Sequence, residues 1–241
     1  MSDISIDNVL VRLKEYRKAE HLSQSGIAVK LGVGQTYYSQ IESGSVSLSY
    51  KVLNKLYSYD CDIDYIITGI CNRSKDDLFI NILKAYDKSE SMKLYKMMIA
   101  GFYQMWSWNM EDRWEKCLYS ELKAMNVLSM NDASFDDRLY YIRVTNGISQ
   151  QKLANILGIG RTKCGKCERG QKKLDAELMM LLHHKGYCLP SFFFEEYVGL
   201  REITYLLERD KEKKDRYYRY VKSVRSNIVN HKSELQKRGV I

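Results

Sequence analysis

The sequence predicts an all-α protein, and three observations lead to that prediction. Its 241 residues include a single proline and only 14 glycines, so helices can run with few breaks. No stretch alternates apolar and polar residues in the way that a half-buried strand does. The third observation is an internal repeat with helical patterning, because residues 12–44 align without a gap with residues 138–170.

The repeat marks a module that the chain uses twice. Twelve of the 33 aligned positions are identical, and each lies 126 residues before its counterpart. In the first copy the identical residues are Arg12, Leu13, Arg17, Ser23, Gln24, Ala28, Leu31, Gly32, Gly34, Thr36, Glu42 and Gly44. These are the residue types that a pair of short, closely crossing helices needs.

Each copy predicts two helices joined by a glycine turn. Ser23 and Ser149 precede helical patterns and are N-cap candidates. Gly32 and Gly158 follow those patterns, at the position where a left-handed residue is favoured. A second short helix is expected after each turn, over residues 35–42 and 161–168. Helix, short turn and helix in this order are typical of a helix-turn-helix.

Two segments resemble the XRE family of DNA-binding domains, also called the Cro and lambda-repressor type. They are LSQSGIAVKLGVGQTYYSQIESG and ISQQKLANILGIGRTKCGKCERG. The chain departs from the family pattern at Gly34 and Gly160, where serine is preferred. It also departs at Tyr38 and Cys164, where an aliphatic residue is usual. The resemblance covers about half of the chain.

The resemblance implies two lambda-repressor-like helix-turn-helix domains, over residues 1–70 and 134–198. A helical middle segment, residues 71–133, is expected to join them, and a basic helical tail, residues 199–241, to follow. The middle segment is predicted to form three helices, over residues 76–88, 91–108 and 111–125. Its many aromatic residues favour a core or spacer, with an effector pocket as the alternative.

The tail carries a heptad seam, with apolar or aromatic residues at spacings of four and three. The seam consists of Tyr217, Val221, Val224, Ile228, His231 and Leu235. It covers fewer than three heptads, so we expect it to pack against another surface. That surface is either the body of the protein or a second copy in a homodimer.

The family pattern also implies two structural ion pairs, Arg17–Glu42 and Arg143–Glu168. Each would tie the first helix of its module to the third. The alternative is a catalytic or phosphate-contacting arginine.

DNA contacts are expected on the helix after the glycine turn of each module, residues 35–42 and 161–168, and at its margins, because this helix enters the major groove in the family. Candidates in the first module are Gln24, Gln35, Thr36, Tyr37, Ser39 and Gln40. Candidates in the second are Gln150, Arg161, Thr162, Lys163, Lys166, Lys172 and Lys173. The two glutamines at positions 24 and 150 match a DNA-backbone contact of the family, and the last two lysines are candidate phosphate contacts. Arginine and lysine favour guanine edges, whereas glutamine favours adenine.

The charge of the chain is unevenly distributed. Its net charge is +8, made up of −1 in residues 1–70, zero in 71–133, +3 in 134–198 and +6 in 199–241. Because DNA affinity has a large electrostatic component, the two modules should not bind DNA equally. An alternative is that the first module contacts a protein partner and only the second binds DNA.

Cys164 and Cys167, taken with His184 and Cys188, have a spacing that zinc sites use. The repeat alignment favours another interpretation, because it places both cysteines of the second helix at inward positions, where a thiol acts as a small hydrophobe. We therefore expect no metal and no cofactor, with zinc or a thiol switch as alternatives. No nucleophile–base arrangement or phosphate-binding glycine loop is recognisable, so we do not expect an enzyme.

The sequence therefore predicts a regulator of transcription that binds double-stranded DNA at specific sequences. We expect it to act as a repressor. We expect a cytoplasmic protein of a bacterium or phage, because no secretory signal is recognisable. No membrane contact is expected, because the most apolar window, residues 97–108, is too short to span a bilayer. A small-molecule, peptide or protein effector, or a toxin partner, are alternatives that the sequence leaves open.

Overall fold

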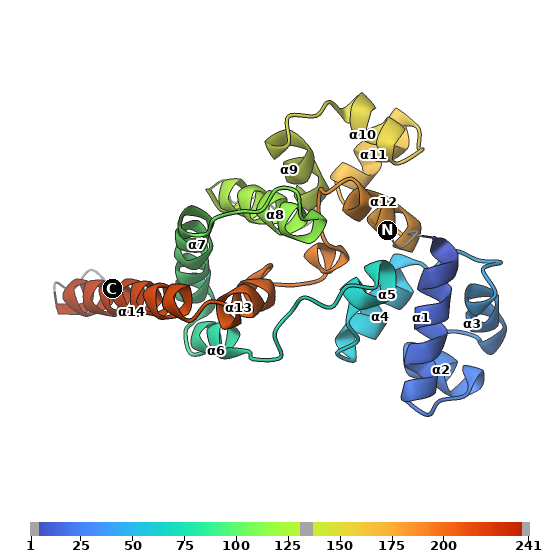
Figure 1. The fold of residues 1–241 in the computed structure, drawn as a ribbon, viewed down its shortest axis with the longest axis horizontal. Helices are drawn as coiled ribbons and strands as arrows, with labels where there is room; N and C mark the ends of the chain where they lie inside the picture. Colours follow the sequence, from blue (N-terminus) through green and yellow to red (C-terminus); the bar gives the residue numbers. More distant parts are fainter. Residues whose placement is uncertain (1–4, 131–136, 238–241) are drawn as a thin grey trace. The chain divides into compact units, whose positions relative to one another are not determined.

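The computed structural model describes residues 5–130 and 137–237, without the side chains of residues 128–130 and 229–237. Within these ranges every regular element is helical and no strand occurs (Figure 1). The helices form two compact units. Unit 1 comprises Met1–Cys71, Asn109–Glu121 and Ser134–Glu195, and unit 2 comprises Asn72–Trp108, Leu122–Ala133 and Glu196–Ile241.

Unit 1 contains the same series of five helices twice, together with the start of α8 (Arg113–Met130). The first series is α1 (Ile6–Ala19), α2 (Gln24–Leu31), α3 (Gln35–Glu42), α4 (Tyr50–Ser58) and α5 (Ile63–Thr68). The second is α9 (Arg138–Thr145), α10 (Gln150–Ile156), α11 (Arg161–Glu168), α12 (Ala176–His184) and the 3₁₀ helix η2 (Pro190–Phe193). We call residues 5–69 the first repeat and residues 137–195 the second repeat.

The repeated framework is longer than the sequence alignment. Both α4 and α12 have nine residues, and α12 begins and ends 126 residues after α4. The Arg12 guanidinium donates hydrogen bonds to the carbonyls of Ile66, at 2.8 Å, and Ile67, at 2.9 Å, at the end of the first repeat. Arg138, its counterpart, donates to the carbonyls of Phe192 and Glu195 at the end of the second. The same type of bond therefore closes both repeats.

Left-handed backbone positions recur at the same interval. His21 and Asp60 have φ values of 55° and 57° in the first repeat. Their counterparts are glycines, Gly147 with φ 66° and Gly186 with φ 74°. Because non-glycine residues seldom adopt such angles, this agreement in backbone conformation reflects the same chain path rather than the same residues.

The two repeats contact each other through their last helices. α5 packs against α12 and against η2. Phe194, just after η2, stacks on Tyr50 and Tyr57 of α4, with ring centroids 5.0 and 5.8 Å apart. The Ser191 backbone N–H donates to Asp64 Oδ1 at 2.7 Å, so a buried carboxylate of the first repeat binds the backbone of the second.

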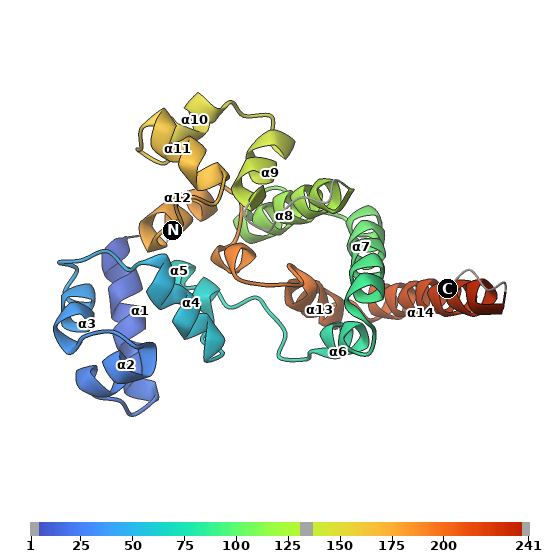
Figure 2. The same ribbon diagram turned by 180° about the vertical axis from the view of Figure 1, so that it is seen from behind.

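Unit 2 is built from α6 (Leu78–Lys84), α7 (Lys88–Met105), the end of α8, α13 (Leu200–Glu208) and α14 (Lys211–Lys237). α14 lies beside α7 in both views (Figures 1 and 2). Tyr217 of α14 is fully buried there and meets the rings of Phe79 and Phe102 edge-on, with centroids 5.3 and 5.5 Å apart. None of the described helices combines the length and the apolar character needed to cross a membrane.

Two predictions about the helices need correction. The middle segment does form three helices, but they begin and end at residues other than those predicted. The tail is helical over its described residues, but it consists of two helices that break between α13 and α14, where the Asp210 carboxylate accepts a hydrogen bond from the Lys213 N–H at 3.0 Å. The division of the chain into four domains stays a prediction.

The heptad seam of the tail is used within unit 2 along its first part. Tyr217 and Val221 are buried, whereas Val224 and Ile228 are half-buried. The side chains of His231 and Leu235 lie outside the described residues. The protein's own body therefore covers the start of the seam.

Candidate nucleic-acid interface

A serine cap at the start of α2 and two glycines after it fix this helix and the turn that leads to α3. Ser23 Oγ accepts a hydrogen bond from the Gly26 N–H at 3.0 Å and caps α2. Gly32 ends α2 with a φ of 66°, in the left-handed region. Gly34 then precedes α3 without a side-chain cap, which leaves the first N–H groups of α3 for another acceptor.

The sequence-predicted residues of the first repeat lie on one helix but differ in exposure. Gln35, Thr36 and Gln40 are exposed on α3, whereas Tyr37 and Ser39 are half-buried. The Tyr37 hydroxyl lies 3.4 Å from Ser49 Oγ. Tyr38 and Ile41, on the opposite side of α3, are completely buried. A polar, weakly charged face is thus held outward by an apolar inner face.

The second repeat presents a more basic surface from α11. Arg161, Thr162 and Lys166 are exposed, and Lys163 is half-buried. Gly160 precedes α11, also without a side-chain cap. The inner face consists of the buried Cys164 and Cys167, so the cysteines occupy the positions of Tyr38 and Ile41.

Both arginine–glutamate pairs are present in the structure. In the first repeat, Arg17 Nε lies 2.7 Å from Glu42 Oε1, and Gln24 Nε2 donates to Glu42 Oε2 at 2.8 Å. Burial by itself would raise the pKa of Glu42, but the hydrogen bonds from Arg17 and Gln24 outweigh it, and the pKa lies below its usual value. The carboxylate is therefore charged and fully engaged, and α1, α2 and α3 meet at it.

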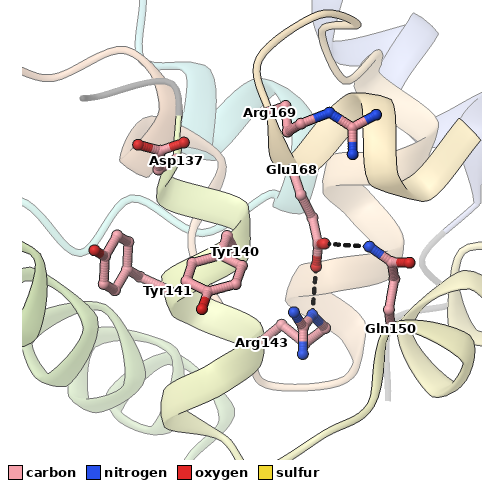
Figure 3. A pocket seen from close by; sticks show the side chains of 7 residues that line it. All are labelled: Asp137, Tyr140, Tyr141, Arg143, Gln150, Glu168 and Arg169. Atoms are coloured by element: carbon pink, nitrogen blue, oxygen red, sulfur yellow. Dashed lines mark hydrogen bonds and ion pairs between the residues drawn. The ribbon is translucent and has the colours of Figure 1, made fainter. Parts of the chain in front are cut away.

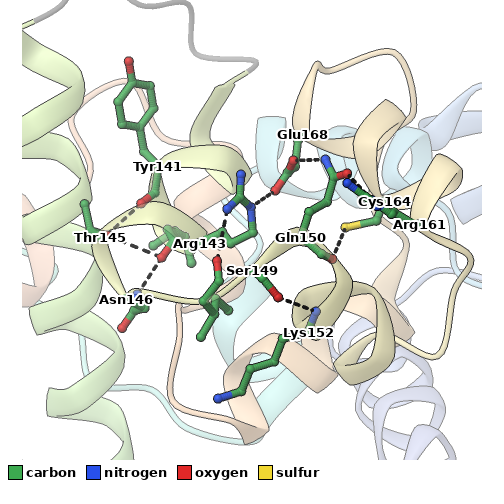
Figure 4. Close-up of polar contacts among 12 residues, drawn as sticks. Tyr141, Arg143, Thr145, Asn146, Ser149, Gln150, Lys152, Arg161, Cys164 and Glu168 are labelled. Atoms are coloured by element: carbon green, nitrogen blue, oxygen red, sulfur yellow. Dashed lines mark hydrogen bonds and ion pairs between the residues drawn. The ribbon is translucent and has the colours of Figure 1, made fainter.

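The second repeat extends this network by one residue. Arg143 Nε donates to Glu168 Oε1, and Gln150 Nε2 donates to Glu168 Oε2 at 2.7 Å. Gln150 Oε1 lies 3.3 Å from Arg161 Nε, so the glutamine joins the buried carboxylate to the first residue of α11 (Figure 4). The sequence predicted a DNA-backbone contact for Gln150 but not this contact with Arg161. The only signal for it was a long cationic residue at position 161, where the first repeat has Gln35.

Next to this network lies a pocket of about 400 Å³ (Figure 3). Its lining residues are Asp137, Tyr140, Tyr141, Arg143, Gln150, Glu168 and Arg169. The predicted effector pocket was placed in the middle segment, whereas this pocket belongs to the second repeat.

The two lysines that follow α11 are exposed. The Lys172 N–H donates to the Lys166 carbonyl at 3.2 Å, which fixes the chain as it leaves α11. Lys173 Nζ lies 5.7 Å from the centroid of the Tyr50 ring of the first repeat. The Lys173 ammonium therefore lies near α4 of the first repeat, whereas the backbone of Lys172 is tied to α11.

The cysteine and histidine positions do not converge. Burial, together with Glu168 and Cys167, raises the pKa of Cys164 to about 11, so this thiol is protonated at neutral pH. His184 is exposed, whereas Cys188 is buried. Among the described residues, no group of three or more His, Cys, Asp or Glu side chains is arranged to hold a metal ion.

Comparison with known proteins supports one of the two modules. A helix-turn-helix family model, HTH_3, matches residues 13–57, and a second copy is not detected. The searches of curated proteins and of solved structures found no match. Residues 13–57 therefore form one helix-turn-helix domain of the XRE type, a domain that suggests DNA binding and transcriptional regulation and is typical of non-enzymatic regulators.

Proposed function

We propose that this protein is a sequence-specific, double-stranded-DNA-binding regulator of transcription, a repressor, in which both repeats act as helix-turn-helix modules of one chain. The observation that carries the proposal is the recurrence of the same hydrogen bonds in both repeats. The Arg17–Glu42–Gln24 cluster of the matched domain has its counterpart in Arg143–Glu168–Gln150. A buried charged cluster is costly to assemble, so its recurrence is specific to the fold.

In this proposal α3 and α11 each enter a major groove. The exposed side chains at their N-terminal ends contact base edges, namely Gln35 and Thr36 in α3 and Arg161 and Thr162 in α11. Tyr37, Ser39 and Gln40 of α3, and Lys163 and Lys166 of α11, line the same grooves. Gln24, Gln150, Lys172 and Lys173 contact the DNA backbone and set the position of the modules.

The two modules contribute unequally. Arg161 is held through Nε by Gln150, so its two terminal nitrogens are left to make the bidentate contact that guanine accepts. The first repeat offers glutamine at that position, and residues 1–70 have a net charge of −1. We therefore assign most of the electrostatic affinity to the second repeat, and adenine-directed contacts to the first.

Selection of binding sites from a random duplex library at near-physiological salt tests the proposal. Wild type should enrich two half-sites at one fixed spacing. Gln35→Ala with Gln40→Ala should abolish enrichment of one half-site only, and Arg161→Ala with Lys166→Ala should abolish the other. All four residues are exposed, so these variants should fold as wild type does. Absence of any enriched sequence would contradict sequence-specific binding.

One observation favours a second candidate, in which the first repeat binds a protein and only the second binds DNA. Val29 of α2 is 80% exposed and Val11 of α1 is 54% exposed, so both leave apolar surface that a protein partner could cover. This candidate predicts that the α3 double variant leaves the selected site unchanged in length and sequence. A shortened site supports the two-module function instead.

A further inference from the structure

We propose that the duplication extends from each repeat into the helical hairpin that follows it, with only α8 lying outside it, so that the protein is a two-fold dimer fused into one polypeptide. One half consists of the first repeat followed by the hairpin α6–α7, and the other of the second repeat followed by the hairpin α13–α14. Unit 2 is then the dimerisation core, occupied by the two hairpins of one chain. The duplication itself does not rest on the proposed function; only what it implies for DNA binding does.

The two hairpins of unit 2 have the same construction, offset by 123 residues. Asp87 Oδ1 accepts a hydrogen bond from the Glu90 N–H at 3.0 Å at the start of α7. Asp210 Oδ1 accepts from the Lys213 N–H, also at 3.0 Å, at the start of α14. Each aspartate is followed by lysine, and each aspartate carbonyl accepts a bond of 2.9 Å from the residue four positions later.

The buried positions of the two hairpins also match at this offset of 123 residues. Leu83, Leu94 and Met98 are buried in the first hairpin. Their counterparts at the same offset, Leu206, Tyr217 and Val221, are buried in the second. Few of these positions keep the same residue type, and for this reason the relation is not visible as a sequence repeat.

The order of the parts is also the same in both halves. The offset is 126 residues throughout the repeats and 123 residues throughout the hairpins. The difference falls in the connectors, because α5 and α6 are joined by a longer segment than η2 and α13. Each half therefore runs from a five-helix repeat through a short connector into a helical hairpin.

The contacts are those of a two-fold interface. In such an interface the elements nearest the axis meet their own counterparts. In unit 2, α7 packs against α14 and α6 against α13. In unit 1, α5 packs against its counterpart η2. This is the pattern expected when two copies of one protomer associate through a self-complementary surface.

The α7–α14 contact is close and specific. Tyr217 and Tyr220 donate hydroxyl hydrogen bonds to the carbonyls of Met98, at 2.9 Å, and Met97, at 2.8 Å. A Cβ atom at Gly101 would collide with the Tyr220 ring, so a larger residue there would displace this ring. Because α7 already covers Tyr217 and Val221, the start of the α14 seam is not free to bind a second copy of the chain.

The first test is the mass of the unmodified chain in solution without DNA. Sedimentation equilibrium should give the 28.3 kDa of one chain at all micromolar concentrations. A mass of two chains would overturn the proposal, because a fused dimer needs no second copy. This measurement involves no DNA, so its failure is distinct from failure of the proposed function.

The second test separates the halves. Residues 1–133 and 134–241 are produced together in one cell, so that every residue of the chain is present, with an affinity tag on the first polypeptide only. We expect the untagged polypeptide to co-purify at one to one. Recovery of the tagged half alone would overturn the proposal.

Gly101→Leu in the tagged half identifies the contact that holds the halves together. It should weaken their association at least tenfold, because the new side chain occupies the place of the Tyr220 ring. Gln104→Leu, at an exposed position of the same helix, should leave the association unchanged. Equal association of both variants would show that unit 2 is not the dimerisation core.

Discussion

Gln150 shows how one residue type acquires a second role from its neighbour. Gln24 and Gln150 are identical in the sequence alignment, and both donate to the buried glutamate of their repeat. Only Gln150 also has an arginine within reach, at 3.3 Å. The glutamine could be placed from the sequence, because position and residue type are both visible in the repeat. Its contact could not, because the direction of an amide depends on side chains from other helices.

Replacing Arg161 tests base recognition at this residue. Arg161→Ala should cost roughly 1–3 kcal/mol on the selected site and relax the preference at one base pair. Binding isotherms on the site and on its single-base variants measure both effects. Lys185→Ala, another exposed cation of the second repeat, should change neither. Equal weakening on every duplex would show that Arg161 contacts only phosphate.

His183 should make the stability of the protein depend on pH. Burial lowers its pKa from 6.5 to about 4, helped by Arg113 and His184, and its Nδ1 lies 3.5 Å from the buried Cys117 Sγ. The unfolded chain binds a proton below pH 6.5, whereas the folded one does so only near pH 4. Stability is therefore full above pH 6.5 and falls as the pH decreases toward 4, by about 2 kcal/mol at pH 5.

Urea unfolding at pH 7 and pH 5 measures this effect. His183→Gln should reduce the loss between the two pH values, since the residue that titrates has gone. The same change at the exposed neighbour, His184→Gln, should alter the loss much less, because burial and not His184 is the main cause of the lowered His183 pKa. An identical pH dependence in all three proteins would show that His183 is not the responsible group.

At the scale of single helices, prediction succeeded where glycines mark both ends of a helix. The helices over residues 35–42 and 161–168 begin and end as predicted, because glycines stand before and after each. The break between α13 and α14 was missed, because no glycine or proline interrupts the pattern there. An aspartate that caps the next helix produces the break, and such a residue is also common on exposed helix faces.

Replacing Gly26, within α2, and Gly32, at its C-cap, by alanine should change the stability of the protein in opposite directions. Gly32 has a φ of 66° and open space around the position of a Cβ atom, so Gly32→Ala should destabilise by about 1 kcal/mol through backbone strain alone. Gly26 lies within α2 with ordinary helical φ, and an added Cβ would meet its nearest neighbour at 3.4 Å, so Gly26→Ala should stabilise by up to about 1 kcal/mol. Thermal unfolding of both variants compares them, and a gain of stability in Gly32→Ala would contradict the left-handed assignment.

At the scale of the whole molecule, the sequence predicted that a module occurs twice but not how the two copies meet. Repeated residues such as Ser23 and Gly32 mark local turns and caps, which each copy must keep in order to fold. Surfaces where copies meet, such as Tyr50 and Tyr57 against Phe194, differ from their counterparts Ala176 and His183. Packing between helices depends on shape, which no fixed spacing encodes.

The unequal charge of the chain should appear in the salt dependence of DNA binding. Lys172→Gln with Lys173→Gln should reduce the slope of log K against log salt by up to about 2, because each lysine that contacts phosphate contributes roughly one unit. Lys84→Gln with Lys88→Gln removes the same charge from exposed positions of unit 2 and should change the slope much less. Equal slopes for the two double variants would show that Lys172 and Lys173 act only through net charge.

The packing of α7 against α14 also bears on how operator occupancy would depend on the concentration of the protein. A regulator assembled from two free chains loses operator occupancy abruptly on dilution, because single subunits accumulate and bind poorly. Halves joined in one chain cannot drift apart, so occupancy falls in proportion to the amount of protein. Each half is also free to change its own contacts, and the operator need not be a palindrome. For the repressor proposed above, dilution of the protein by cell growth would relieve repression gradually, and the two arms of the operator could differ in sequence.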